Sequence, residues 1–168
     1  MKHLSWKYIA GLVDGEGCLD FQVGRSRYTR ADGSNACYLY LTPRLRLALV
    51  ASCRPLIDLL ANQCGGNVFE DKRTKYNPNW QDALYWQLEN TRLRGTLQRI
   101  IPFLHIKREQ AKFLLWLIDN MRGKTVKQHG MEKLDAARRV AREEMKAMKR
   151  DPQRLSERAI ENVLRTLD

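Results

Sequence analysis

The stretch that most constrains the fold is 9–17, which combines three glycines and two carboxylates after an apolar beginning. Apolar residues recur near helical spacing from residue 4 onward, and this predicts a short amphipathic helix whose core-facing residues are Trp6, Ile9, Ala10 and Val13. Gly11 and Gly15 lie four residues apart on one face, and a face without side chains lets another backbone approach closely. Gly15 and Gly17 are expected to break the helix.

Two acidic residues, Asp14 and Glu16, lie at the predicted end of this helix. The carbonyl groups at a helix C-terminus carry partial negative charge, which disfavours a nearby anion. A hard divalent cation, coordinated by carboxylate and carbonyl oxygens, would remove this conflict. If the glycine face meets a second copy of itself, two carboxylates arrive side by side, an arrangement suited to metal-assisted phosphodiester hydrolysis. The same residues are also compatible with a simple turn after a helix.

The nonapeptide 9–17 resembles the LAGLIDADG motif of homing endonucleases, with conservative replacements that include Glu16 for the final Asp. The motif occurs once, which is similar to the family members that act as homodimers. The resemblance implies a twofold interface between motif helices, formed here by Ile9, Gly11, Leu12 and Gly15. It also implies that Glu16 of each copy, together with the Gly15 carbonyl, binds Mg²⁺ at a scissile phosphate, in sites that Mn²⁺ or Ca²⁺ can also occupy.

A second local match is 102–111, which resembles the family stretch that opens the third core helix. The family's lysine there lies near the active site, so the resemblance implies a catalytic role for Lys107; without the family, Lys107 is simply a solvated first-turn residue. One departure concerns a glutamine that some homodimeric members carry near the end of the second strand to position solvent. The matching stretch 47–52 has no polar side chain before Ser52, so either water and Ser52 substitute or activity is weak or lost.

Charge and size restrict the function classes further. The chain has 168 residues and a formal net charge of +11, which indicates a polyanionic partner, although a merely basic surface is the alternative. This length predicts one core domain, residues 1–121, with a helical extension, 122–168, packing on it.

The spacing of the cysteines and the lengths of the apolar runs indicate the cellular compartment. The four cysteines are not at metal-ligand spacing, which predicts buried free thiols in a reducing environment. No apolar run is long enough to span a bilayer and no leader precedes the first helix. We therefore expect an intracellular protein, in a bacterial or archaeal cytoplasm or an organelle.

Periodicity predicts the remaining elements. Strands are expected at 18–28, 37–49, 67–74 and 80–89, and helices at 52–63, 91–101, 107–121, 131–149 and 156–167, with a basic loop at 122–128. Ser52, Thr91 and Ser156 are predicted helix caps, and Pro43 is expected at a bulge or edge. The order predicts an α+β fold, an αββαββα core with a four-stranded antiparallel sheet, helices on one face and extra C-terminal helices. The resemblance implies that the sheet is saddle-shaped.

The other face of this sheet is predicted to be polar and basic, and a β-ribbon of this kind fits the DNA major groove. Outward side chains expected to read bases are Gln22, Arg25, Arg27, Tyr38, Tyr40, Arg44, Arg46, Lys72, Arg73, Tyr85 and Gln87, and Lys75 adds a further DNA contact. Cations expected to contact phosphates are Arg30, Lys124, Lys127, Lys149, Arg150 and Arg154.

Taken with the resemblance, these features predict an intron-homing type of endonuclease. It would hydrolyse both strands of a long, near-palindromic double-stranded DNA target as a metal-dependent homodimer. An intron maturase or a non-cleaving, sequence-specific nucleic-acid-binding protein on the same fold is the alternative. A helix-turn-helix regulator using residues 131–167 would explain the tail but leave the glycine-acid motif without a role.

Overall fold

The structure of the chain, a computed structural model, describes residues 3–30, 32–121 and 130–168. The chain forms two compact units, one from Met1–Leu19 and Arg44–Arg108 and the other from Asp20–Pro43 and Glu109–Asp168. The predicted domain boundary after residue 121 stays a prediction. The basic loop expected at 122–128, with Lys124 and Lys127, lies outside the described residues.

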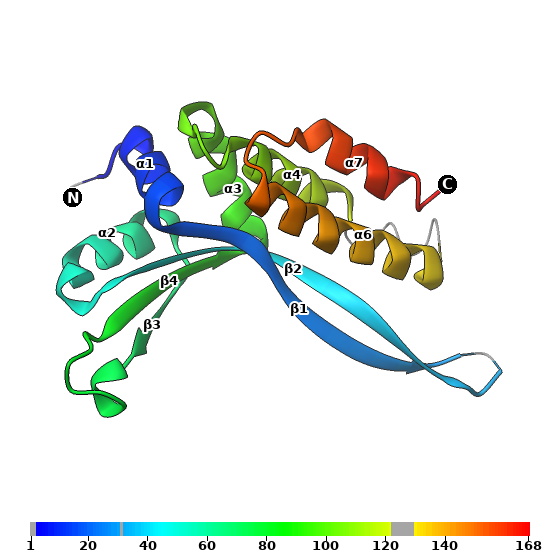
Figure 1. Cartoon of the computed structure of the whole chain (residues 1–168), viewed down its shortest axis with the longest axis horizontal. Coiled ribbons are helices and arrows are strands. Elements are labelled where there is room, and N and C mark those ends of the chain that lie inside the picture. The colour runs from blue at the N-terminus through cyan, green and yellow to red at the C-terminus, as the bar shows by residue number, and fades with distance from the viewer. Residues whose placement is uncertain (1–2, 31, 122–129) are drawn as a thin grey trace. The chain divides into compact units, whose positions relative to one another are not determined.

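The helices and strands follow the predicted αββαββα order, with further helices at the C-terminal end (Figure 1). They are α1 (Trp6–Glu16), β1 (Gly17–Thr29), β2 (Asn35–Val50), α2 (Arg54–Cys64), β3 (Asn67–Asp71), β4 (Ala83–Glu89), α3 (Asn90–Ile100), α4 (Arg108–Asn120), α6 (Met131–Arg150) and α7 (Ser156–Leu164). The α+β class is therefore confirmed.

The four strands form one sheet in the order β1-β2-β4-β3. Strand β4 pairs antiparallel with β2, from Arg44↔Glu89 to Val50↔Ala83, and with β3, from Asn67↔Gln87 to Asp71↔Ala83. Strands β3 and β4 are shorter than predicted, because residues 72–82 form a loop that contains a 3₁₀ turn. The backbone N–H and hydroxyl of Thr74 both donate to the Asp82 carboxylate, at 3.0 and 2.8 Å, and this closes the loop.

The core of the first unit is centred on Trp86 of β4, which is fully buried. Its indole N–H donates to the carbonyl of Gly65, at the end of α2, at 2.8 Å. Helix α2 packs on β3 and β4, and α3 packs on β4 and α1. The predicted core face of α1 is confirmed for Ile9, Ala10 and Val13, which are fully buried.

The second unit joins one end of the β1–β2 hairpin to α4, α6 and α7. The backbone N–H of Leu39 in β2 donates to Asp135 of α6 at 2.5 Å, and the Leu39 carbonyl accepts from Arg138 at 2.8 Å. Helix α6 thereby satisfies strand groups beyond the segment that pairs with β4. Glu144 of α6 accepts two hydrogen bonds from Arg154, at 2.8 and 3.0 Å, which hold the chain leading into α7.

The predicted helix caps are wrong. Ser52 lies in a 3₁₀ turn, Ala51–Cys53, that precedes α2, and α3 begins at Asn90 without a side-chain cap, before Thr91. Ser156 is the first residue of α7, and its N–H and hydroxyl donate to Glu109 of α4 at 3.0 and 2.7 Å. The carboxylate that caps α7 therefore comes from another helix.

Two smaller predictions also change. Pro43 lies within β2, which is an inner strand, but it precedes the segment that pairs with β4, so its missing N–H interrupts no β2–β4 bond. None of the four cysteines, all within the described ranges, forms a disulfide. Cys37 is exposed and the others are half-buried, so the prediction of buried thiols is wrong. No described helix is long and apolar enough to cross a membrane.

Candidate functional site

Helix α1 passes directly into strand β1, with no loop between Glu16 and Gly17. The side chain of Ser5 caps the helix start by accepting from the Tyr8 N–H at 3.2 Å. The helix continues through Gly15 to Glu16, so the predicted break at Gly15 is wrong, and β1 begins at Gly17. A Cβ at Gly17 would lie 2.7 Å from the Val13 carbonyl oxygen, so this junction requires glycine. Glu16 is thereby presented, exposed, in the last turn of α1.

Asp14 is half-buried and binds the backbone of the segment that leads into α4. Its two carboxylate oxygens accept from the N–H groups of His105, at 2.7 Å, and Lys107, at 2.9 Å. Asp14 therefore has a structural role, since it ties the end of α1 to this segment. Asp14 fixes where the Lys107 side chain begins.

The Lys107 ammonium lies on the C-terminal carbonyls of α1. It donates to the carbonyl of Val13 at 2.9 Å and also to that of Asp14. Burial lowers the pKa of Lys107, while the negative charge of Asp14, and to a smaller extent Cys18 and Glu16, opposes that shift. The Lys107 ammonium therefore offsets part of the repulsion between the C-terminal carbonyls of α1 and the nearby carboxylates, for which the sequence analysis invoked a metal ion.

Glu16 has no hydrogen bond or ion pair to any residue in the described ranges. No group of three or more His, Cys, Asp or Glu side chains able to hold a metal is found there either. The donor set nevertheless suits Mg²⁺, which is often bound through one or two carboxylates plus phosphate oxygens and water rather than by a cage of protein ligands. A single copy supplies one such carboxylate.

The glycine face of α1 is open. A Cβ added at Gly11 or at Gly15 would meet no atom within 4 Å, and both residues are exposed. Leu12 is half-buried beside them. Ile9 was expected on the same surface, but its side chain is 0% exposed because it faces the opposite side of the helix and packs in the core. Its assignment to an exposed interface is therefore wrong.

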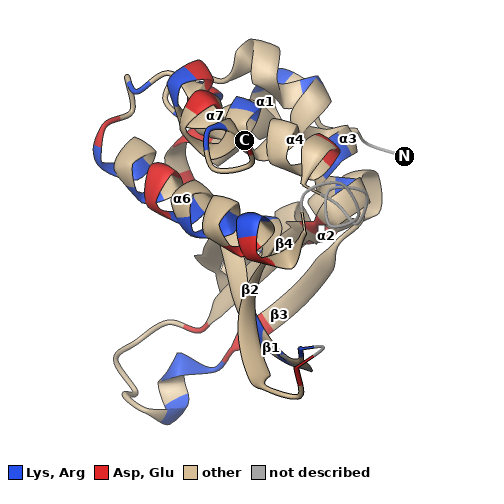
Figure 2. Cartoon of the chain, turned by 90° about the vertical axis from the view of Figure 1, so that its right-hand side faces the viewer, with Lys and Arg blue, Asp and Glu red and all other residues tan. Residues whose placement is uncertain are grey.

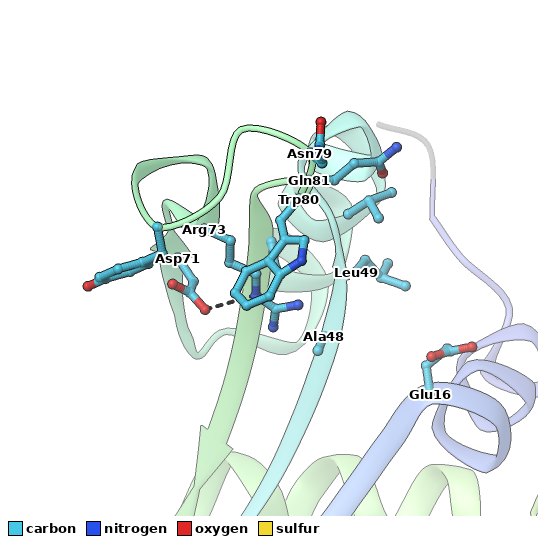
Figure 3. Close-up of a pocket in the computed structure, with 11 residues that line it drawn as sticks. Glu16, Ala48, Leu49, Asp71, Arg73, Asn79, Trp80 and Gln81 are labelled. Carbon is cyan, nitrogen blue, oxygen red and sulfur yellow. Dashed lines mark hydrogen bonds and ion pairs between the residues drawn. The ribbon is translucent and has the colours of Figure 1, made fainter.

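Glu16 also lines a hollow of about 810 Å³ within the first unit (Figure 3). The β2 residues that line it are Ala48, Leu49 and Val50, in the stretch that lacks the family's glutamine. The rest of the lining comes from the β3–β4 side and comprises Asp71, Arg73, Tyr76, Asn79, Trp80, Gln81 and Ala83. The sequence patterns predict no site role for Asn79, Trp80 or Gln81, although an aromatic and two amides follow the basic run 72–75.

Three of the predicted base-reading residues come together on the first unit. The Arg73 guanidinium donates to Asp71 at 3.0 Å and also to the Tyr85 hydroxyl, which itself donates to Asp71 at 3.3 Å. The Arg46 guanidinium lies 5.3 Å from the centre of the Tyr85 ring. Lys72 and Lys75, which flank Arg73 in the sequence, are both exposed. Figure 2 shows the resulting basic turn after β3 in blue. Arg44 and Gln87 are half-buried, and Gln87 donates to Glu89 at 2.7 Å.

The other predicted contacts lie in the second unit. Gln22, Arg25 and Arg27 are exposed on β1, Arg150 is exposed at the end of α6, and Tyr38 is half-buried. The Tyr40 ring lies against Gly24, where a Cβ would come within 2.0 Å of it. Three cations expected to contact phosphates already have carboxylate partners, since Arg30 pairs with Glu132 at 3.2 Å, Lys149 with Asp20 at 3.6 Å, and Arg154 with Glu144.

Comparison with known proteins places the fold. No protein-family model and no curated protein sequence matches the chain. Among solved structures, the homing endonuclease I-CvuI in complex with DNA is 20% identical, with 96% of this chain and 93% of that chain covered and a TM-score of 0.62. The homing endonuclease I-TnaI is 20% identical, with 98% and 99% covered and a TM-score of 0.57. The chain has the LAGLIDADG homing endonuclease fold.

The LAGLIDADG homing endonuclease I-SmaMI, bound to cleaved DNA, is 20% identical with a TM-score of 0.54, but only 42% of that chain is covered, against 79% of this one. The present chain thus corresponds to one LAGLIDADG fold, carrying one motif helix. I-CvuI was crystallised with DNA in 2 mM Mg, where the DNA was not cleaved, and with its target in 2 mM Ca.

Proposed function

We propose that the chain is a site-specific DNA endonuclease that acts as a homodimer and requires a divalent metal. The observation that carries the proposal is the end of α1, where an exposed Glu16 follows a helix face on which Gly11 and Gly15 leave open space. The fold is that of enzymes crystallised on DNA with Mg or Ca, which supports the same substrate class for this chain.

The proposed dimer forms when the α1 helices of two copies meet through Gly11, Leu12 and Gly15. The absence of side chains at the two glycines permits the close backbone approach. Each copy then contributes its Glu16 carboxylate and Gly15 carbonyl to the same region. Two carboxylates and the phosphates of a bound duplex together form a donor set suited to Mg²⁺.

A divalent ion, when bound, supplies a water of lowered pKa and neutralises phosphate charge. The chain's own residues hold and orient the reacting groups. Glu16 would hold the ion, and Lys107 would place a fixed positive charge where negative charge grows on the phosphate. Asp14 positions Lys107 through its backbone N–H, at 2.9 Å, so it acts without contacting the phosphate.

Recognition of double-stranded DNA follows from the basic surfaces of both units. Arg46, Arg73 and Tyr85 would contact base edges from the first unit, because an arginine suits guanine in the major groove. Exposed cations such as Arg25, Arg27 and Arg150 would contact bases or phosphates from the second. A homodimer reads related half-sites, so the proposed target is near-palindromic, and an intracellular location remains part of the proposal.

The test begins with selection of bound sequences from a randomised DNA pool, using the Glu16→Gln variant in Ca²⁺ so that the pool is not cut. The wild-type protein should then cleave both strands of the selected DNA in Mg²⁺ and neither strand in EDTA. Glu16→Gln should bind within a few-fold of wild type and cleave at least about a thousandfold more slowly. Glu161→Gln, the same charge change at an exposed position of α7, is the matched control and should cleave normally. Normal cleavage by Glu16→Gln would remove Glu16 from the mechanism.

A non-cleaving nucleic-acid-binding protein or a maturase is the second candidate. The apolar lining Ala48, Leu49 and Val50 favours it, since no polar side chain from this part of β2 positions solvent beside Glu16. Tight, salt-dependent binding to the selected DNA without cleavage in Mg²⁺ or Mn²⁺ would establish this candidate. Binding and assisted splicing of an intron RNA would distinguish the maturase from a DNA-binding regulator.

A further inference from the structure

Two exposed aromatic side chains line the same hollow as the proposed catalytic carboxylate. Trp80 is 55% exposed and Tyr76 is 81% exposed, and both line the hollow that Glu16 also lines (Figure 3). Trp86, in contrast, is fully buried, and Trp6 and Trp116 are half-buried. Large aromatics are mostly buried in folded proteins, so two of them held in water around one hollow indicate a surface that binds a flat, apolar group.

The loop that carries these rings is fixed at both ends. The Asp82 carboxylate accepts from the backbone and hydroxyl of Thr74, and the Asp82 carbonyl accepts from the N–H of Ala51 at 2.9 Å. Within the loop, the N–H of Trp80 donates to the carbonyl of Asn77 at 3.0 Å. A ring presented from a backbone already ordered in this way loses little conformational entropy when it binds a partner.

The other groups around the hollow suit a nucleobase. Arg73, held by Asp71 at 3.0 Å, supplies a planar cation, and the side chains of Asn79 and Gln81 supply amide donors and acceptors. Leu49 and Val50 supply an apolar wall, and Val50 is itself 42% exposed. In Figure 3 the Trp80 indole projects from the loop into the space between Leu49 and the Asp71–Arg73 pair. Stacking on an aromatic ring, combined with amide and guanidinium contacts to base edges, is how proteins bind bases that have left the helical stack.

We propose that this hollow receives one unstacked base of the DNA target next to the cleaved phosphate, with Trp80 as its stacking platform. The inference rests on the proposed function, since it needs DNA beside Glu16. Unstacking is easiest at pyrimidine–purine steps, so the selected targets should carry such a step at this position. The hollow thereby selects DNA by deformability rather than by base edges alone.

The experiment measures the affinity of each variant for the selected DNA in Ca²⁺, a condition in which binding is measured without cleavage. Trp80→Leu keeps an apolar side chain but removes the ring, and it should weaken binding about tenfold to a hundredfold, as expected for one base–aromatic stack. Trp80→Phe should remain within a few-fold of wild type because it keeps a ring. Leu164→Ala truncates another exposed apolar side chain, 43% exposed on α7 and outside the hollow, and should bind normally.

A direct readout of stacking accompanies the affinities. Tryptophan emission should be quenched on DNA binding by wild type and by Trp116→Phe, but not by Trp80→Phe. Permanganate should modify a thymine placed at the step in the wild-type complex more than in free duplex, and Trp80→Leu should abolish the increase. The inference would be overturned if Trp80→Leu bound DNA as tightly as wild type and if DNA quenched the emission of Trp80→Phe as much as that of wild type. Cleavage by the wild-type protein would be unaffected by that result.

Other results are distinguishable from that one. If wild type binds no DNA, the proposed function fails and the inference fails with it. If Trp80→Leu shifts the monomer–dimer equilibrium in the absence of DNA and Trp80 emission changes on dilution, a second copy of the chain occupies the hollow, which also overturns the inference.

Discussion

The two acidic residues at the end of α1 should have opposite effects on stability. Asp14 accepts two backbone N–H groups, at 2.7 and 2.9 Å, whereas Glu16 is exposed at the helix C-terminus and has no partner within the described residues. Hydrogen bonds to a charged acceptor contribute about 1.5–3 kcal/mol each. An asparagine at position 14 keeps one carbonyl acceptor and turns an amide donor toward the other N–H. Allowing for the partial exposure of Asp14, Asp14→Asn should lower the free energy of unfolding by about 2 kcal/mol.

Glu16→Gln should leave the free energy of unfolding unchanged or raise it by about 0.3–1 kcal/mol, because it removes a negative charge from the carbonyl end of a helix. The same variant should lose cleavage. A residue that costs stability and is needed for activity is the pattern expected of a functional site rather than of a structural one.

Urea unfolding of wild type, Asp14→Asn, Glu16→Gln and the control Glu161→Gln measures both effects. All four are compared at one protein concentration, since the proposed dimerisation would make apparent stability depend on it. A loss of about 2 kcal/mol moves the urea midpoint down by roughly 1 M and the melting temperature by about 4–8 °C. If Asp14→Asn is as stable as wild type, or Glu16→Gln loses as much as Asp14→Asn, the assignment of the two carboxylates is refuted.

Three further outcomes are expected. Gly11→Ala should stabilise the isolated chain by about 0.5–1 kcal/mol yet raise the dimer dissociation constant in sedimentation experiments. The reason is that the added Cβ lies in open space within one copy but blocks the close approach of two copies. Gly95→Ala, where the added Cβ also lies in open space, should change only the free energy of unfolding. Burial raises the pKa of Glu109, but its bonds to Lys112 and Ser156 outweigh this and hold the pKa below 4.5. The stability that this carboxylate contributes is therefore present above pH 4.5 and is lost as the pH falls through the lower folded value. Glu109→Gln should reduce this loss of stability at acid pH, as measured by denaturation at a series of pH values. DNA affinity should fall steeply with added salt, and a flat dependence would exclude a polyanionic partner.

Much of the fold could be predicted from apolar periodicity, because burial of one face is what forms these helices and strands. The α1 core residues Ile9, Ala10 and Val13 were identified in this way. The caps were not, because a cap is decided by whichever acceptor reaches the free N–H groups. Ser156 has a suitable hydroxyl, but the acceptor at the start of α7 is Glu109, which lies far away in sequence and is brought there by packing of α4.

In the candidate site, too, the sequence indicated which residues matter but not the long-range contacts that surround them. The resemblance implied roles for Glu16, from the nonapeptide, and for Lys107, from the stretch 102–111, but the environment of Lys107 depends on contacts between residues more than ninety positions apart, such as that between Asp14 and the Lys107 N–H. No spacing rule predicts that an ammonium lies on the Val13 carbonyl. For Ile9 the two kinds of reasoning disagreed, since periodicity assigned it to the core and the resemblance assigned it to an interface. Its complete burial supports the physical pattern.

The position of Lys107 changes what a second copy would have to provide. Its ammonium already neutralises carbonyls at the end of α1, so the charge that remains uncompensated there is the Glu16 carboxylate. Within the described residues of one chain, this carboxylate has no ion-pair partner and the space beside Gly11 and Gly15 is open, and each feature alone lowers stability or leaves it unchanged. Bringing two copies together would use both at once, since the bare face permits the approach and the approach creates a two-carboxylate site that a divalent cation can neutralise. Metal binding and dimerisation should therefore be thermodynamically linked, with Mg²⁺ tightening the wild-type dimer in sedimentation experiments and leaving the Glu16→Gln dimer unchanged.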